Sequence, residues 1–299
     1  MALPSDYLDF LQPDCDRKEF IQKRLMDCGI KSSVLVIEGK NHIYVDFASS
    51  CYNPQYKLKT LVAHYDRVPG TQGANDNSSG VFALIEAAKK IAALDTIHNV
   101  RIIFTDGEEE GRFGVASQGA FSLAKKLKEL NFDEGDIFVF DCIGRGDVPV
   151  ICEIDLPPKV DKNFARKYQT LVSQTQNVVS RYSPLPNLVL PSSFSDNAGF
   201  VANGIPAVAV TMLPKDEVIN YMSNLKRIPG LRQSVMNRRL EDIPSKVAPE
   251  YILRESIPLT WRYIHTEFDK VTTLTPNSFN IISKIIDDIV RLNYLKPVM

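Results

Sequence analysis

The sequence predicts an α/β fold, with a mostly parallel, twisted central sheet and helices on both faces. Short apolar runs of strand length alternate along the chain with amphipathic runs of helix length, which is typical of parallel sheets covered on both sides. Three of the apolar runs are followed within two residues by histidine or acidic side chains: Leu61–Ala63, Ile102–Phe104 and Ile137–Phe140. We expect antiparallel strands at the amino-terminal edge of the sheet.

Periodicity and turn residues place the elements of the first half. Apolar positions recur at helical spacing before Gly29, which ends the first helix, and the turn at 39–41 joins two strands. Ser78 or Ser79 can cap the next helix. In order, we expect a helix at Asp16–Cys28, strands at Val34–Ile37, His42–Phe47 and Leu58–Ala63, a helix from Ser78 or Ser79 to Ala93, a strand at Arg101–Thr105, a helix at Ala116–Leu130 and a strand at Asp136–Phe140.

In the second half of the chain, strand-length and helix-length runs continue to alternate, and this pattern then weakens. Proline and serine make Ser183–Ser195 a predicted loop, and the pattern weakens between Pro214 and Trp261. We expect one domain over 1–299, with 215–260 as an inserted lid, an oligomer contact or a surface excursion without function. The remaining predicted elements are a strand at Val148–Glu153, a helix at Asp161–Val178, a strand at Ile205–Val210 and an amphipathic helix at Asn277–Tyr294.

Composition narrows the function class. The chain of 299 residues is 44% apolar and 24% charged, as in soluble globular proteins. Its formal net charge of −1 favours neither nucleic acid nor an anionic membrane, and we find no apolar stretch long enough to span one. The five cysteines are widely spaced without a CxxC pair, and the start shows no signal peptide, so we expect free thiols and a cytoplasmic location.

Histidine and acidic side chains follow three predicted strands. His64 and Asp66 follow the first, Glu108 and Glu109 the second, and Asp141 the third. Because the carboxyl ends of parallel strands face one crevice, we expect these side chains to converge. Carboxylates combined with imidazole suit a divalent cation, zinc above all. The sequence therefore predicts a metal site.

Some of these residues also have a structural interpretation. His64 could be a buried histidine satisfied by the backbone, and Asp76 lies among Asp, Asn and Ser residues that are ordinary at a helix start. Considered together with His64, however, Asp76 is better explained as a ligand that bridges two metals. Asp141 would be costly to bury unpaired after four apolar residues, which also favours a ligand.

Three adjacent glutamates, Glu108–Glu110, repel one another unless a cation or water separates them. They would suit a helix dipole, but adjacent glutamates can also divide the work, one binding a metal while its neighbour moves protons. His265 lies far along the chain beside Thr266. The settings of His42 and His98 are those of structural residues.

The ordered set of motifs resembles metallopeptidase family 28, the double-zinc aminopeptidase family, which also contains glutamate carboxypeptidase-like enzymes and the glutaminyl cyclases. The resemblance runs from about Leu61 to the closing helix and implies the phosphorylase/hydrolase-like architecture of zinc exopeptidases. The motifs are HxD at 64–66, a GxNDNxSG-like turn at 73–80, DGEEEG at 106–111, Asp141, SDxxxF at 195–200, GIPA at 204–207 and HT at 265–266.

The resemblance implies a ligand set for two Zn²⁺ ions. His64 and Asp141 would hold one ion, Glu109 and His265 would hold the other, and Asp76 would bridge them. The two ions would lie roughly 3.5 to 4 Å apart. Carboxylate-rich sites of this kind can also accept Mn²⁺ or Co²⁺.

The resemblance also implies a mechanism. Glu108 would be the general base that activates the bridging water and later protonates the leaving amine, and Asp66 would orient His64. The substrate would be a peptide whose free amine lies against acidic groups, so that cleavage is amino-terminal. A homo-oligomer is compatible with everything in the sequence.

Two positions depart from the family pattern. The usual histidine after Ser-Asp is Asn197, and the tyrosine often found before the last histidine is Ile264; Tyr263 points elsewhere if that segment is extended. Two alternatives to the aminopeptidase therefore stay open. One is a glutaminyl cyclase-like acyltransferase with a single zinc, although the cyclase-type tryptophan directly before the last histidine is absent, since the only tryptophan is Trp261. The other is a binding module that has lost catalysis.

Overall fold

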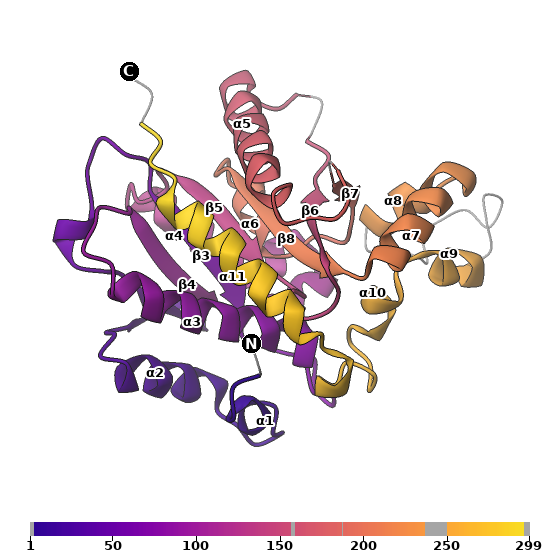
Figure 1. The fold of residues 1–299 in the computed structure, drawn as a ribbon. Coiled ribbons are helices and arrows are strands. Elements are labelled where there is room, and N and C mark those ends of the chain that lie inside the picture. The colour runs from indigo at the N-terminus through magenta and orange to yellow at the C-terminus, as the bar shows by residue number, and fades with distance from the viewer. Residues whose placement is uncertain (1–2, 157–158, 187, 237–249, 296–299) are drawn as a thin grey trace.

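The computed structural model describes residues 3–156, 159–186, 188–236 and 250–295, and its centre is an eight-stranded sheet (Figure 1). The strand order is β1-β2-β4-β3-β5-β8-β6-β7. The strands are β1 (Ser33–Ile37), β2 (Lys40–Val45), β3 (Lys59–His64), β4 (Val100–Thr105), β5 (Asp136–Phe140), β6 (Val148–Glu153), β7 (Val189–Pro191) and β8 (Ala207–Leu213).

The four central strands β4, β3, β5 and β8 run parallel to one another, and β1 and β2 add an antiparallel edge. The predicted α/β class, with a mostly parallel sheet and an antiparallel amino-terminal edge, is confirmed. At the other edge β6 runs antiparallel to β8, and β7 runs parallel to β6. We did not predict this reversal, because a short apolar run has the same pattern in either direction.

Helices cover both faces of the sheet, and alternate strand residues pack against them. On β3, Leu61 and Ala63 belong to the core with α3 and α11, whereas Val62 belongs to the core with α4 and α6. Figure 1 shows α3, α5 and α11 on the near face. The helices are α1 (Tyr7–Phe10), α2 (Arg17–Asp27), α3 (Gly80–Ala92), α4 (Gly119–Glu129), α5 (Lys162–Val179), α6 (Asp196–Ala202), α7 (Lys215–Arg227), α8 (Leu231–Met236), α9 (Glu250–Ser256), α10 (Leu259–Tyr263) and α11 (Pro276–Arg291).

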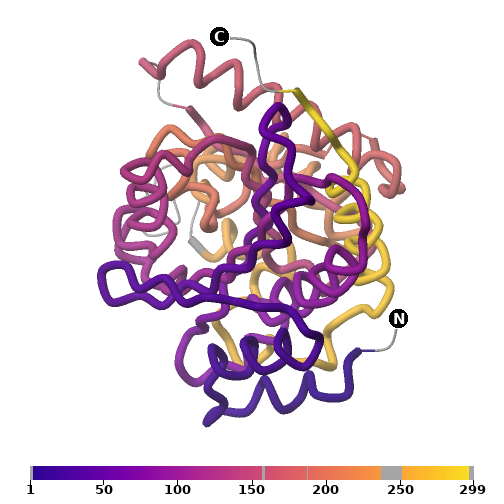
Figure 2. Tube along the Cα trace, turned by 90° about the vertical axis from the view of Figure 1, so that its left-hand side faces the viewer, coloured from indigo at the N-terminus to yellow at the C-terminus, as the bar shows by residue number. Residues whose placement is uncertain are grey.

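The amino-terminal segment braces the loop that follows β3. The ring of Tyr7 lies 4.5 Å from that of Phe82 on α3, and its hydroxyl donates to the carbonyl of Ala74 at 2.7 Å. Buried Arg17 donates to the hydroxyl of Ser78 at 3.2 Å. Figure 2 shows the first helices, in indigo, together at one end of the molecule. The sequence did not predict α1, whose single turn is too short to show periodicity.

The segment 215–260 consists mainly of helices where it is described, and residues 237–249 of it lie outside the described residues. Helices α7, α8 and α9 pack on β6 and β7 in a separate apolar cluster that includes Val148, Leu190 and Leu231. The ring of Trp261, on α10, contacts that of Tyr221 edge-on at 5.3 Å. The roles considered for this segment, a lid or an oligomer contact, stay predictions.

One local expectation was wrong, and one helix was not predicted. The predicted loop Ser183–Ser195 contains β7, whose three residues end in a proline at the sheet edge, where proline is tolerated. Helix α6 follows this loop and was not predicted. Among the described helices, none is both long and apolar enough to cross a bilayer, and all five cysteines are free.

Buried neutral histidine should make the fold acid-sensitive. Burial, helped by the charge of Lys59, lowers the pKa of His98 from its ordinary value to about 4. Between about pH 4 and 6.5 only the unfolded chain then takes up this proton, so stability falls as pH drops through that window. The loss cannot exceed about 1.4 kcal/mol per pH unit for one proton.

His98→Asn should flatten this dependence. The Nδ1 atom of His98 accepts from the backbone N–H of Val100 at 3.2 Å, and the side-chain oxygen of asparagine can accept the same bond without titrating. Urea unfolding between pH 4.5 and 7 measures the effect. If the free energy of unfolding fell equally with pH in the wild type and in His98→Asn, His98 would not take up this proton on unfolding.

Candidate metal centre

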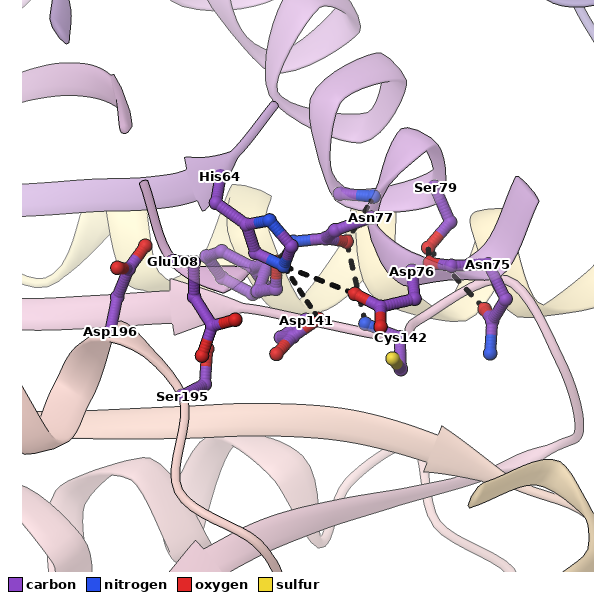
Figure 3. A network of polar contacts seen from close by, with 12 residues as sticks. His64, Asn75, Asp76, Asn77, Ser79, Glu108, Asp141, Cys142, Ser195 and Asp196 are labelled. Carbon is purple, nitrogen blue, oxygen red and sulfur yellow. Dashed lines mark hydrogen bonds and ion pairs between the residues drawn. The ribbon is translucent and has the colours of Figure 1, made fainter. Parts of the chain in front are cut away.

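The first side-chain cluster lies at the carboxyl ends of β3 and β5 (Figure 3). His64 is the last residue of β3, Asp141 follows β5, and Asp76 lies in the turn before α3. The Nε2 atom of His64 lies 3.1 Å from Asp76 Oδ1 and 3.5 Å from Asp141 Oδ1. Their ligand atoms lie close enough together to hold one metal ion.

A second cluster uses the other oxygen of Asp76. The Nε2 atom of His265 lies 3.2 Å from Asp76 Oδ2 and 2.8 Å from Glu109 Oε2. Glu109 begins the turn after β4, whereas His265 comes from the segment after α10. The structure thus brings together all five residues expected to bind metal, in two groups that share Asp76. Their role as ligands stays a prediction.

The donor set fits divalent cations. The Nε2 atom of His64, Asp141 Oδ1 and both carboxylate oxygens of Glu109 are buried without a hydrogen bond to any described residue. Each group combines two carboxylates with one imidazole, which suits Zn²⁺ and also Mn²⁺ or Co²⁺. Acidic side chains outnumber the two imidazoles in and around the two clusters. The acidic residues are Asp66, Asp76, Glu108, Glu109, Asp141, Asp196 and Asp269.

The crowding of these charges perturbs the ionisation of the ligands. Burial and the charge of Asp76 raise the pKa of Glu109 to about 7. Burial alone would lower the pKa of His265, but the carboxylates of Asp76 and Glu109 outweigh it and raise that pKa to about 10. The two imidazoles hold the pKa of Asp76 well below its ordinary range despite its burial. Cations placed between these groups would relieve the same repulsion.

Asp66 joins the first cluster to the loop that carries Glu108. Its Oδ1 atom lies 3.3 Å from Nδ1 of His64, on the side of the ring opposite the cluster. Its two oxygens accept the backbone N–H groups of Glu108 and Glu109 at 3.1 and 3.0 Å. These partners lower its pKa although burial opposes them. The geometry suits the predicted role of orienting His64.

The turn that carries Asp76 is clamped to the loop after β5. Asn77 donates to the carbonyl of Phe140 at 2.9 Å, and the side-chain oxygen of Asn75 accepts the backbone N–H of Gly144 at 2.7 Å. At Gly80 a Cβ atom would clash with that same Phe140 carbonyl oxygen, so only glycine permits this close approach. A cis peptide bond joins Asp76 and Asn77. The clamp fixes the position of Asp76 relative to the end of β5.

The serines of this turn do not cap α3 as expected. Ser78 donates to the carbonyl of Gly73, and Ser79 donates to that of Asn75. Ser79 also accepts the backbone N–H of Ile143 at 3.0 Å. The capping prediction was wrong because the tertiary clamp uses these hydroxyl groups.

Asp269, which no sequence signal singled out, holds the turn from the other side. Its carboxylate oxygens accept the backbone N–H groups of Asn75 and Asp76 at 2.7 and 3.0 Å. Burial and the charge of Asp76 raise its pKa to about 7. Asp269 follows His265 by four residues, so the same segment supplies a member of the second cluster and a support for the shared carboxylate.

Glu108 lines the cleft that also contains Asp76, Asp141 and His265. It is 2% exposed, and its Oε1 atom accepts a hydrogen bond from the side-chain amide of Gln118 at 2.9 Å. No sequence signal pointed to Gln118. Figure 3 shows Glu108 between Asp196 and the residues of the first cluster. A buried carboxylate in this position can accept a proton from a water in the cleft.

The two departures from the family pattern occupy different places. Asn197 is buried in the first turn of α6, where its side-chain oxygen accepts the backbone N–H of Ser195 at 3.1 Å. Ile264 lines the cleft beside His265. Tyr263 ends α10 and stacks with Arg145, whose guanidinium lies 5.3 Å from the ring. Tyr263 is therefore in a helix, and Ile264 and His265 form the turn that follows it.

Asp196, next to Asn197, is fully buried and was given no role from the sequence. The hydroxyl of Thr105 donates to its Oδ2 atom. Burial and the nearby charge of Glu108 raise the pKa of Asp196 to about 8. A second buried carboxyl group thus lies behind Glu108, as Figure 3 shows.

Comparisons with known proteins agree with this architecture. Aminopeptidase YwaD of Bacillus subtilis (strain 168) is 36% identical over 75 residues, which are 24% of this chain and 16% of that protein. Glutaminyl cyclase of Porphyromonas gingivalis superposes with a TM-score of 0.60 at 15% identity, over 95% of this chain and 93% of that one. A Zn-dependent exopeptidase of Parabacteroides distasonis superposes with a TM-score of 0.59 at 14% identity, over 96% and 95%.

The family model of peptidase family M28 matches residues 52–290. This range contains both side-chain clusters and most of the sheet, and it confirms the resemblance drawn from the motifs. The chain belongs to peptidase family M28.

Proposed function

We propose that this chain is a metal-dependent aminopeptidase that binds two divalent cations, Zn²⁺ foremost. His64 and Asp141 would hold one cation, and Glu109 and His265 the other. Asp76 would bind both. The substrate would be a peptide with a free amino terminus, whose amine lies against the acidic groups of the centre.

The position of Asp76 carries this proposal. Its two oxygens face two different imidazoles, Oδ1 at 3.1 Å from His64 and Oδ2 at 3.2 Å from His265. A single-metal site would need only one of these arrangements. A carboxylate shared between two groups of ligands is the arrangement that a pair of cations requires.

The chain's own residues would then carry the proton transfers. When bound, the cations would supply Lewis-acid polarisation of the scissile carbonyl and a more acidic water. Glu108 would accept the proton of the attacking water and pass it to the leaving amine. Gln118 fixes the carboxylate of Glu108 through its hydrogen bond, and Asp66 fixes the ring of His64.

The relatives support a zinc exopeptidase, and they include a protein of the cyclase alternative as well. YwaD is named an aminopeptidase, and the Parabacteroides structure is described as a Zn-dependent exopeptidase. The Porphyromonas structure is a glutaminyl cyclase on the same fold. We favour the aminopeptidase because both ligand groups are complete in this chain.

Metal removal tests the proposal directly. We expect two metal ions per chain by elemental analysis, hydrolysis of aminoacyl p-nitroanilides, loss of that activity with a chelator, and its return with Zn²⁺ or Co²⁺. One ion per chain with cyclisation of amino-terminal glutamine would support the cyclase instead. A protein that binds no metal would be a non-catalytic binding module.

Metal removal should also destabilise the fold, which gives a readout independent of turnover. Each site filled at about 100 times its Kd contributes roughly 2.7 kcal/mol. Two such sites would shift the Tm by about 10 °C or more in a chain of this size. Differential scanning calorimetry before and after chelation measures the shift. An unchanged Tm would contradict cation binding between the clusters.

A further inference from the structure

We infer that Arg145 is a positioning residue for the second cluster: its guanidinium fixes the chain segment that presents His265, and Glu217 fixes the guanidinium. We call residues 260–273 the His265 segment. The inference rests on the proposed function and adds a role for a residue outside the ligand set. Arg145 lies in the loop after β5, four residues beyond Asp141, and its side chain is 19% exposed.

His265 needs support from outside its own segment. It follows the end of α10 with a backbone φ of 63°. Residues other than glycine persist in this left-handed region only where the surrounding structure holds them. The side chain of His265 is 45% exposed, so packing around it does little to fix its position. His64, by contrast, ends a strand that is buried along its whole length.

Arg145 contacts the His265 segment on both sides of the histidine. Before it, the Nε atom donates to the hydroxyl of Thr260 at 2.9 Å, and the guanidinium carbon lies 5.3 Å from the ring centre of Tyr263. After it, the Nη1 atom donates to the backbone carbonyl of Thr273 at 3.3 Å. One planar side chain thus holds both ends of the segment, which removes much of the conformational freedom of the residues between them.

Glu217, in the first turn of α7, completes this anchor. Its Oε1 atom accepts a hydrogen bond from Nη2 of Arg145 at 3.1 Å, and its Oε2 atom accepts the backbone N–H of Thr260 at 2.8 Å. Only 11% of the Glu217 side chain is exposed. Partial burial strengthens such charged hydrogen bonds, because little water competes for them. The carboxylate therefore links the guanidinium to α7 and to the first turn of α10.

The loop that carries Arg145 is itself held on both sides. The carbonyl of Gly144 accepts the backbone N–H of Thr275 at 2.7 Å, and the N–H of Gly144 donates to the side chain of Asn75 at 2.7 Å. The N–H of Gly146 donates to the hydroxyl of Thr275 at 3.1 Å. Arg145 thus projects from a loop that is tied to the turn before α3 and to the start of α11.

Helix α7 thereby supports the second cluster rather than the first. Figure 1 shows α7 beside α10, and the chain of contacts runs from Glu217 through Arg145 to the His265 segment. Loss of the guanidinium should loosen His265, whereas the turn that carries Asp76 keeps its clamp to the loop after β5. We therefore expect metal affinity to fall at one position of the centre only.

Arg145→Met tests this inference, because methionine keeps an apolar stem but can donate no hydrogen bond. Titration of the metal-free protein with Co²⁺ against a competing chelator, followed by visible absorption, measures the two affinities. We expect one of them to fall by at least about tenfold, the effect of losing a residue that supports a ligand. In the His265→Gln background, which keeps only the first cluster, Arg145→Met should change the remaining affinity by less than about twofold.

Hydrogen exchange of the metal-free protein gives a readout that needs no metal. Arg145→Met should raise the exchange rates of amides in the His265 segment by about tenfold or more, the effect of losing a charged hydrogen bond, while β3 stays protected. Arg181→Met is the matched control. It also removes a guanidinium paired with a carboxylate, that of Asp288, but this side chain is 59% exposed. The control should change neither readout.

Glu217→Gln keeps the size of its side chain and tests the same anchor if Arg145→Met does not fold. It should lower the same affinity and raise exchange over the same residues. An equal fall in both affinities, or unchanged exchange in the His265 segment, would overturn the positioning role and leave the two-cation proposal intact. A wild-type chain that binds fewer than two cations would overturn the proposed function instead, and exchange would still decide whether Arg145 holds the segment.

Discussion

Glu108→Gln should reduce kcat for aminoacyl p-nitroanilides by about 10² to 10⁴, the usual contribution of a positioned general base. Glutamine keeps the shape of the side chain but cannot accept a proton. Because Glu108 belongs to neither group of ligand residues, the metal content should stay at two ions per chain. Steady-state kinetics and elemental analysis of the same preparation measure both effects.

Glu110→Gln is the matched control for this substitution. Glu110 lies two residues away on the same loop, but its side chain is 49% exposed and pairs with Lys40. Removing its charge should change kcat by less than about twofold, since exposed ion pairs contribute little. If both variants lost activity equally, the loop charge would matter rather than proton transfer by Glu108. Full activity of Glu108→Gln would exclude Glu108 as the base.

The convergence of the site could be predicted because it follows from a rule about sheets. His64, Glu109 and Asp141 are separated by tens of residues, but each lies at or just after the carboxyl end of a parallel strand, and these ends meet at one edge of the sheet. The strand runs were recognisable because both faces of each strand are buried. Distant His265 could be placed only through the family resemblance, because it follows a helix rather than a strand.

The supports of the site could not be predicted, because they depend on tertiary contacts. In the sequence, Asn75 and Asn77 are ordinary residues for a helix start. In the structure, their side-chain amides clamp the turn to the loop after β5. In the sequence, nothing distinguishes Asp269 from the other acidic residues. In the structure, its carboxylate accepts the backbone N–H of Asp76. Capping propensity is local, and here the clamp takes precedence over it for Ser79.

Asp76→Asn should weaken metal binding at both positions of the centre. The substitution removes the charge that both clusters share. We expect the metal affinity of each cluster to fall by at least about 100-fold. Losing a residue that only supports a ligand costs about 10- to 100-fold, and losing a ligand should cost more. Elemental analysis after dialysis should approach zero ions per chain, and hydrolysis should be lost with the metal.

His265→Gln is the comparison that distinguishes a shared ligand from an ordinary one. His265 contacts the second cluster only, and its side chain is 45% exposed, so the fold should tolerate its loss. This variant should retain one ion, held by His64, Asp76 and Asp141, while Asp76→Asn retains neither. If both variants kept one ion, Asp76 would belong to a single site. Its role as a ligand shared by the two cations would then have to be abandoned.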